Sequence, residues 1–516
     1  MAERIVSYRD TFINSSGTFL SRLTGILKQN VVNYLFGASQ DPFILAFRLV
    51  NSFRRYIGEG ALTSAFIPVY QKEMSEKKHK NKADLFASNV INIFLIITGF
   101  LTITGIILAP YYTPYLVPGY KKGSFELHSN ILLTMIMMPY IIFIFLYAIS
   151  MGILNCHKKF FTSAFSPLFF NIAFIVIPIL FYKQLGIYSL GIAVLIGVIA
   201  MFLFQLFELI PLKFKYSFYL NPKDQSLKSF FSLFNPTAIN MIVLTVKNLV
   251  TTLFLSLYIG SAMLYMNAMM IIEAPLGIVG IAIGTVIMPL LSRFNANRDE
   301  KNFQKTLVEG FYLFFYLMIP ISVFFILFPD TIINSVFRDI MKIFTGNTGK
   351  FTPLLMKQNY IALSIYSLAL IPMGCTVLFE KLFYSRHDAK TPLFANIVVF
   401  IISFSLYFSA LIPSISFYGV FIADTIAAWM TLIYYLYFLN KASIKINYFK
   451  SKFLKKIVAL ILLSFVSAAL ILPFHIYVYL KKWHPFISFS LAGIELALFG
   501  GIYYILSRIF GLELKR

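Results

Sequence analysis

The stretch VINIFLIITGFLTITGIILA, residues 90–109, contains no charged residue. A helix rises 1.5 Å per residue, so this stretch would span about 30 Å, the thickness of a bilayer's hydrocarbon core. Comparable apolar runs recur along the chain, for example IVVFIISFSLYFSALI at 397–412. The strands of a membrane barrel would instead alternate over about ten residues. The pattern therefore predicts an all-α polytopic membrane protein.

The composition agrees with that class. Of the 516 residues, 59% are hydrophobic and 13% are charged, whereas soluble domains carry about 25% charged residues. We predict about fourteen spans. They lie near residues 11–36, 42–71, 86–113, 126–154, 161–182, 186–212, 229–259, 263–292, 304–334, 355–385, 391–412, 416–440, 453–479 and 486–511.

The net charge of +23 comes largely from alternate inter-span loops. One set of loops is rich in lysine, as at 72–82 and 441–452, and the other set is poor. The one exception is the stretch 338–357, which belongs to the poor set and has four basic residues. The positive-inside rule then predicts cytoplasmic termini and a multi-pass protein of the cytoplasmic (inner) membrane. The first apolar segment has no cleavage-site pattern, so we expect it to be a retained helix. No nucleic-acid partner is expected.

Motifs for enzyme chemistry are missing from the sequence. The two cysteines, Cys156 and Cys375, show no metal or disulfide spacing, and the six histidines form no HExxH pair. A polyprenyl-phosphate enzyme would need clustered aspartates for Mg²⁺, but the aspartates of this chain are isolated. There is no Walker A motif. We therefore expect a transporter with no metal and no cofactor.

The stretch RLVNSFRRYIGEGALTSAFIPVY, residues 48–70, places charges at membrane depth. At about 100° per residue, Arg48, Asn51, Arg55 and Glu59 share an arc of roughly 80°, with Arg54 to its side. A charge at the bilayer centre costs about 2.5–3.5 kcal/mol. Snorkelling could explain Arg48 alone, and an Arg55–Glu59 pair could be structural. The whole stripe predicts a water-filled cavity.

The first span carries a similar stripe. Its members are Ser15, Thr18, Arg22, Gln29 and Asn33, with Lys28 beside them. Snorkelling could again explain Lys28 taken alone. Together, the two spans give an excess of positive charge, which suits an anionic substrate, and guanidinium forks suit phosphate in particular.

Three blocks of the sequence carry a family resemblance. They are SRLTGILKQNVVNYLFGASQDPFILAFRLVNSFRRYIGEGALTSAFIPVY at 21–70, EAPLGIVGIAIGTVIMPLLSRF at 273–294 and LFYSRHDAKTPL at 382–393. In order and spacing the chain resembles the lipid II flippases of the MurJ (MviN) family, within the multidrug/oligosaccharidyl-lipid/polysaccharide exporter superfamily.

The resemblance implies two pseudo-twofold six-helix lobes, at 1–228 and 229–445, and a C-terminal helix pair at 446–516. It implies that the protein moves undecaprenyl-pyrophosphate-linked peptidoglycan precursor from the inner to the outer leaflet by alternating access. The matching site residues are Arg22, Lys28, Arg54, Arg55, Asp41, Glu59 and Glu273. Besides this anionic lipid, membrane lipids and other cell-wall synthesis or division proteins are the suggested partners, and a monomer is expected.

Two positions depart from the family pattern. Lys28 stands where many relatives have arginine, and the stretch YMNAMMIIEAP at 265–275 has no cation before Glu273. Lys247, in the middle of span 7, could supply the missing charge, or it could pair with Asp424 of span 12. Both alternatives stay open. We find no carboxylate and amide pattern for sodium, so no tight sodium site is expected.

Other functions and roles also stay open. A flippase for another polyprenyl-pyrophosphate-linked glycan would share the cationic cavity, whereas a drug exporter would need carboxylates there. The stretch FYSRHDAKTP, with Arg386, Asp388 and Lys390, is interpreted first as a turn that ends a helix, and second as a cytoplasmic gate.

Overall fold

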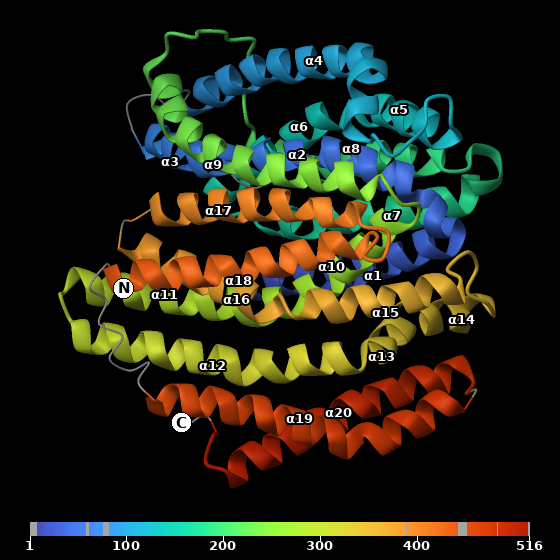
Figure 1. Ribbon diagram of the computed structural model, residues 1–516. Coiled ribbons are helices and arrows are strands. Elements are labelled where there is room, and N and C mark those ends of the chain that lie inside the picture. Colours follow the sequence, from blue (N-terminus) through green and yellow to red (C-terminus); the bar gives the residue numbers. More distant parts are fainter. Residues whose placement is uncertain are drawn as a thin grey trace. The chain divides into compact units, whose positions relative to one another are not determined.

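Helices make up all the regular structure of the part of the chain that the computed structural model describes, namely residues 8–57, 61–75, 82–386, 388, 390–441, 451–481 and 483–513. The all-α prediction is confirmed. Contacts divide the chain into two compact units, Met1–Ala262 and Met263–Arg516, which we call the first and the second unit. Their helices are labelled in Figure 1.

The first unit consists mostly of long helices. They are α1 (Tyr8–Phe36), the 3-10 turn η1 (Gly37–Gln40), α2 (Asp41–Ile57), α3 (Ala61–Ser75), α4 (Lys82–Leu116), α5 (Phe125–Met137), α6 (Tyr140–Cys156), α7 (Phe161–Leu185), α8 (Tyr188–Leu209), η2 (Ile210–Leu212) and α9 (Gln225–Leu255). Within the unit, α7 packs along α8 and α1, and α9 packs against α2, α3 and α4.

The second unit begins within α10 (Ser261–Pro275). Its further helices are η3 (Leu276–Ile281), α11 (Ala282–Ala296), α12 (Glu300–Leu327), α13 (Pro329–Ile333), η4 (Asn334–Asp339), α14 (Ile340–Thr345), α15 (Pro353–Ser367), α16 (Leu370–Ser385), α17 (Lys390–Tyr407), η5 (Phe408–Leu411), α18 (Tyr418–Lys441), α19 (Ser451–Leu480) and α20 (Pro485–Ile509). The hairpin α19–α20 packs on α12 through buried Leu460, Tyr503 and Ile319.

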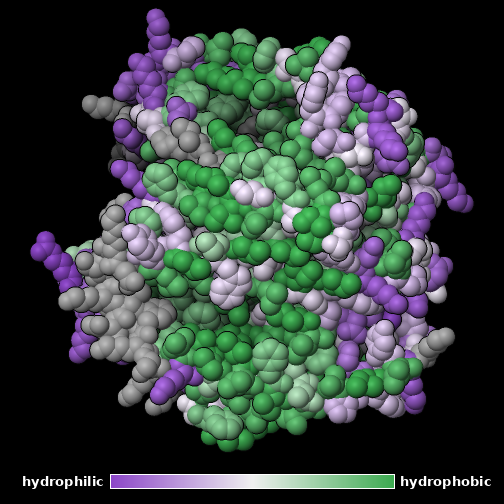
Figure 2. Space-filling view, in the orientation of Figure 1, coloured by the Kyte–Doolittle hydropathy of each residue, from purple (hydrophilic) through white to green (hydrophobic). Residues whose placement is uncertain are grey.

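Ten helices of the described chain are long and apolar enough to cross a membrane, and the bent pair α15–α16 makes an eleventh. Helices α1, α2, α3 and α9 are not among them, and these hold the predicted cations of the first unit. The count of fourteen spans stays a prediction. In the face drawn in Figure 2, apolar side chains cover the middles of the helices and hydrophilic ones gather toward the helix ends. This pattern is typical of a protein with lipid as its lateral solvent.

Polar side chains fix where helices begin. The hydroxyl of Ser124 accepts a bond from the backbone N–H of Leu127 at the start of α5, and the carboxylate of Asp224 accepts one from the N–H of Ser226 at the start of α9. These are N-caps, which satisfy N–H groups that have no partner within the helix.

The segment that leads into α9 is held by α4. The side-chain amide of Asn89 donates to the backbone oxygen of Asn221 at 2.8 Å and accepts from its N–H at 2.9 Å. The amide of Asn92 donates to the backbone oxygen of Tyr219 at 2.9 Å. An amide side chain can replace a neighbouring strand in this way, because it offers one donor and one acceptor. The start of α9 is therefore fixed within the first unit.

Candidate functional site

Helix α2 is amphipathic, with one apolar face and one charged face. Its residues Phe43 and Val50 are buried, and Arg48 is half-buried. The Nε of Arg48 donates to Thr252 Oγ1 at 3.1 Å, and its Nη2 donates to the backbone oxygen of Asn248 at 3.2 Å. Both acceptors are neutral groups of α9. These two bonds orient the guanidinium toward α9.

Lys28 of α1 lies against the aromatic face of α7. Its Nζ is 5.1 Å from the ring centroid of Phe174 and 5.8 Å from that of Phe170. An ammonium group over aromatic rings gains cation–π attraction. The rings of Phe170 and Phe174 also pack against Phe47 of α2, with centroids 6.3 and 6.4 Å apart. The aromatic face that holds Lys28 therefore lies between α1 and α2.

The polar stripe of α1 divides into an exposed and a buried part. The side chain of Arg22 is exposed and forms no hydrogen bond or ion pair with the residues that the structure describes. Further along α1, Gln29 donates to Asn33 Oδ1 at 3.1 Å, and Gln40 donates to the same oxygen at 2.9 Å. All three amides are buried. The stripe thus ends in an amide cluster that fastens η1 to α1.

Asp41 stands at the first residue of α2 and is buried. Its Oδ2 accepts a bond from the N–H of Gly260 at 2.6 Å and a longer one from that of Ala262 at 3.4 Å. A carboxylate with this environment caps the turn between α9 and α10, because the N–H groups there have no helical partner. The geometry favours a structural role for Asp41 over direct contact with a substrate.

Three other predicted site residues are placed only in part. Glu59 and the side chain of Arg55 lie outside the described residues. Lys247 is half-buried on α9, within the first unit. Its pairing with Asp424, a residue of the second unit, stays a prediction.

In the second unit, Glu273 is exposed on α10, just before a break in helical geometry. The following residues, Leu276–Ile281, form the π-helical segment η3 directly after Pro275. Proline removes one backbone N–H from the helical ladder, which favours such a local change. π-helical segments occur frequently at functional sites.

A buried carboxylate of α18 has partners that sequence reasoning did not find. The oxygens of Asp424 accept bonds from the hydroxyls of Tyr407 at 2.7 Å, Tyr265 at 2.9 Å and Ser403 at 3.3 Å. Two of the hydroxyl donors, Ser403 and Tyr407, come from α17, and the third, Tyr265, comes from α10. Tyr265 is 159 residues away in sequence, so no local pattern could have identified it.

The FYSRHDAKTP stretch forms a turn followed by a helix start. Asp388 accepts bonds from the N–H groups of Lys390 and Thr391 at 2.9 and 3.0 Å and caps α17. The guanidinium of Arg386 lies 3.5 Å from a Glu300 carboxylate oxygen and 4.6 Å from the ring centroid of Phe303. These contacts fit the turn interpretation. The gate stays a prediction.

No cluster of three or more histidine, cysteine, aspartate or glutamate side chains in the described residues could hold a metal ion. The first unit presents Lys28 on α1 and Arg48 and Arg54 on α2, with aromatic rings beside Lys28 and a hydroxyl and a backbone oxygen beside Arg48. Such cations can bind an anionic group.

Comparison with known proteins gives consistent matches. The sequence model described as lipid II flippase MurJ matches residues 32–492. A probable lipid II flippase MurJ of Borreliella burgdorferi is 27% identical and aligns over 96% of this chain and 94% of its own. A probable lipid II flippase MurJ of Rickettsia prowazekii is also 27% identical, over 97% of both chains.

Solved structures agree with the sequence matches. A lipid II flippase MurJ in an inward closed conformation superimposes with a TM-score of 0.75 at 26% identity, over 97% of this chain and 99% of its own. An inward-facing multidrug resistance MATE family transporter superimposes with a TM-score of 0.65 at 15% identity, over 84% of this chain and 98% of its own. The second match shows a shared fold alone.

Proposed function

Because this chain belongs to the lipid II flippase MurJ family, we propose that the cations of its first unit bind the pyrophosphate of the lipid-linked precursor. The chain is a multi-pass membrane transporter that flips lipid II. The proposal concerns which side chains carry that activity.

The observation that carries the proposal is that one aromatic ring links the cations of α1 and α2: Phe174 lies beneath Lys28 at 5.1 Å and also packs against Phe47 of α2 at 6.4 Å. The charge of Arg54, also on α2, acts on Lys28 from there. Two like charges near each other in a medium of low dielectric constant repel one another. The aromatic rings beside Lys28 are electrically weak partners compared with a carboxylate. A bound dianion between the two cations would turn this repulsion into attraction, and a guanidinium can grip two phosphate oxygens at once.

Arg48 connects the charged face of α2 to α9. Its bonds to Thr252 and to the backbone of Asn248 hold α9 beside the charged face of α2. We assign it to positioning and to the local positive potential. Arg22, Arg55, Glu59, Lys247 and Glu273 stay predicted members of the site, and Asp41 is proposed to fix the turn that begins α10.

The mechanism follows from the energetics of the substrate. The polyprenyl tail can stay in hydrocarbon, but a pyrophosphate and its sugar–peptide group cannot cross it without compensation. Fixed cations replace water around the pyrophosphate while the cavity opens first to one leaflet and then to the other. No covalent step is needed. The membrane potential could supply about 2.3 kcal/mol per charge per 100 mV.

We further propose cytoplasmic termini, two lobes at 1–228 and 229–445 with a helix pair at 446–516, and a monomeric protein. The distribution of lysines supports the orientation. Cell-wall synthesis or division proteins are the proposed protein partners.

The test is rescue of a flippase-depleted bacterium, combined with translocation of labelled lipid II in reconstituted vesicles. We expect Arg54→Ala and Arg22→Ala to abolish rescue while the protein stays in the membrane at normal level. Arg508→Ala is the matched control, because Arg508 is exposed and pairs only at the surface with Glu513. Full rescue and normal translocation by both Arg54→Ala and Arg22→Ala would refute the assignment.

A further inference from the structure

A polar cavity of about 560 Å³ lies within the second unit, at one end of its helices. Helices α13, α14 and α15, with the π-helical segment η4, form one side. The hairpin α19–α20 and the turn that joins its helices form the other. Ligand pockets commonly have about 300–1,000 Å³. This cavity is therefore large enough for a small polar molecule or a lipid headgroup.

The basic residues of the cavity come from the stretch 338–357, the exception to the alternation of charge along the chain. Three of its residues, Arg338, Lys342 and Lys357, line the cavity. Lys481 follows α19 and lines it too. The loop set to which this stretch belongs is predicted to lie on the side of the membrane opposite the cytoplasm. The positive-inside rule disfavours basic residues on that side. Their presence therefore needs another reason, and a ligand with negative charge supplies one.

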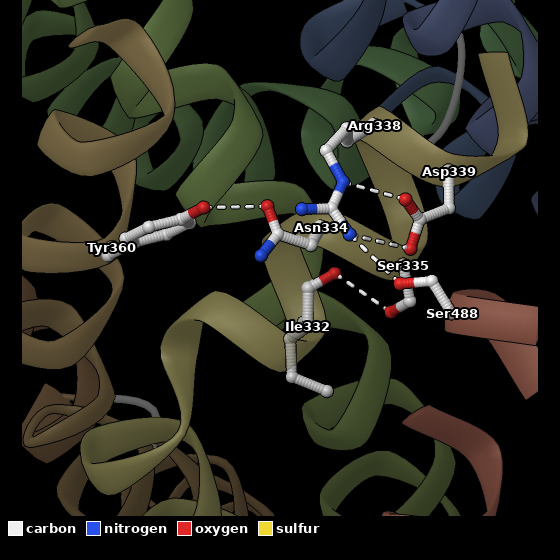
Figure 3. A network of polar contacts seen from close by, with 7 residues as sticks. All are labelled: Ile332, Asn334, Ser335, Arg338, Asp339, Tyr360 and Ser488. Atoms are coloured by element: carbon white, nitrogen blue, oxygen red, sulfur yellow. Dashed lines mark hydrogen bonds and ion pairs between the residues drawn. The ribbon is translucent and has the colours of Figure 1, made fainter. Parts of the chain in front are cut away.

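The carboxylates near these cations already have partners. Arg338 donates to both oxygens of Asp339, at 2.6 and 3.1 Å, and also to Ser488 of α20 at 2.9 Å (Figure 3). Figure 3 also shows Tyr360 of α15 turned toward Asn334, with its hydroxyl 2.6 Å from the amide oxygen. Asp339 is buried. This negative charge is therefore neutralised within the protein.

A second set of partners holds the deeper carboxylates. His475 of α19 lies with Nδ1 2.9 Å from Glu495 of α20 and with Nε2 3.6 Å from Asp330 of α13. The hydroxyl of Thr331 donates to the other Glu495 oxygen at 3.0 Å. Glu495 is fully buried in α20. These contacts join the hairpin to α13. Because the acidic groups already have these partners, they do not need the lysines to compensate their charge.

Donors remain at the mouth of the cavity. Within the part of the chain that the structure describes, Lys342 and Lys357 form no ion pair. The indole N–H of Trp483 is buried and has no acceptor among the same residues. The ammonium of Lys481 stacks over Trp483 at 5.0 Å. A buried donor without an acceptor costs about 1–3 kcal/mol. A ligand that offers an acceptor at this position would therefore bind more tightly.

We propose that this cavity binds an oxyanion, a phosphate or carboxylate group, carried on a small polar body. Lys342 and Lys357 supply the charge, and the Trp483 indole and the Ser488 hydroxyl supply hydrogen bonds. Two sources share this chemistry: the headgroup of an anionic membrane lipid and a small soluble anion. The site lies outside the cations proposed to bind the transported lipid, and its test does not depend on them.

The chain provides its own reporter for the test. It has two tryptophans, Trp429 and Trp483. In a Trp429→Phe background, all tryptophan emission comes from the cavity. The protein is placed in nanodiscs of pure phosphatidylcholine and titrated with inorganic phosphate and with glycerol 3-phosphate. In a second arm, the nanodiscs contain increasing fractions of phosphatidylglycerol. We expect a saturable change in Trp483 emission, with a parallel rise in the thermal midpoint.

The double variant Lys342→Gln/Lys357→Gln should weaken the apparent affinity about tenfold or more. The matched control is Lys121→Gln/Lys122→Gln, two exposed lysines of the first unit that lose the same charge. A response to phosphatidylglycerol alone identifies a lipid headgroup, and a response to both sources identifies a soluble anion as sufficient. If neither source changes the emission or the thermal midpoint, or if the double variant responds like the control, the proposal is wrong.

Discussion

The two units differ in the partners that their charged side chains contact. In the first unit, Lys28 lies on the uncharged aromatic rings of Phe170 and Phe174, and Arg48 donates to a hydroxyl and to a backbone oxygen of α9. In the second unit, buried Asp339 bonds to Arg338 and buried Glu495 bonds to His475. Neutral partners orient a charge and leave its field available, whereas an opposite charge cancels it.

This contrast separates residues kept for binding from residues kept for assembly. A cation that contacts only neutral groups lowers the stability of the fold slightly, because its desolvation is not compensated. Its charge stays available to bind an anion. A buried ion pair contributes little net stability, but it costs a great deal if one partner is lost. Substitutions of the cations in the first unit should therefore impair transport, and substitutions in the buried charge pairs of the second should impair folding.

The largest effect on the binding of lipid II is expected for Arg54→Gln. Loss of a charged hydrogen-bond donor costs about 1.5–3 kcal/mol, so affinity for lipid II should fall roughly 10- to 150-fold. The thermal midpoint should change less than the affinity does, because the proposal assigns this side chain to binding rather than to assembly. Binding and unfolding in detergent measure both. A lower thermal midpoint with unchanged affinity would show that Arg54 serves folding rather than binding.

Glu495→Ala should have the opposite pattern. It removes the partner of His475 and Thr331 from a buried position, and breaking a buried pair costs about 3–5 kcal/mol. The thermal midpoint should fall clearly. Glu309→Ala, which removes an exposed pair with Lys305 at 4.0 Å, is the control and should change stability by less than about 1 kcal/mol. Equal effects of the two substitutions would contradict the ion-pair argument.

Asp41→Ala should have a smaller effect on stability. The N–H groups of Gly260 and Ala262 lose their acceptor, at about 1–3 kcal/mol for each group left without one. Asp41→Asn keeps one acceptor oxygen and should cost less. Hydrogen exchange at the start of α10 measures the loss locally. An alanine variant that exchanges like wild type but does not transport would move Asp41 to the substrate site.

The smallest effect concerns pH and the cap of α17. Partial burial opposes ionisation of Asp388, but bonds from the Thr391 hydroxyl and from the N–H groups of Thr391 and Lys390 outweigh it and lower the pKa of this carboxyl. The stabilisation is present above the unfolded-state value of about 3.9 and is lost as pH falls through the lower folded value. Below about pH 4 we expect α17 to lose protection against hydrogen exchange relative to the intrinsic exchange rate at the same pH, and Asp388→Asn should abolish this pH dependence. An unchanged pH dependence in that variant would exclude the cap as its source.

Much of the fold could be predicted from the sequence. Apolar runs such as residues 90–109 became parts of long helices, because a lipid-facing backbone must satisfy its hydrogen bonds internally. The predicted family resemblance, which was carried by three blocks, is confirmed by the match over residues 32–492. The turn in FYSRHDAKTP was expected from its proline and its charged cluster, whereas the cap that Asp388 forms on α17 comes from the structure.

The surroundings of the candidate site could not be predicted. The rings beside Lys28 come from residues 170 and 174, and the N–H groups that bind Asp41 lie 219 and 221 residues away. Periodicity places Gln29 and Asn33 on a polar stripe, but it cannot tell a water-filled cavity from a buried amide cluster. Partners distant in sequence decide that difference.

The central claim is that the first unit holds cations for the pyrophosphate. Its most direct test compares lipid II with the matching polyprenyl-linked glycan that lacks the pyrophosphate, in binding to wild type and to Lys28→Met/Arg54→Gln. Wild type should prefer lipid II by at least about tenfold, since each lost charged contact is worth 1.5–3 kcal/mol, and the double variant should bind both lipids alike. An undiminished preference for lipid II in the double variant would contradict the account.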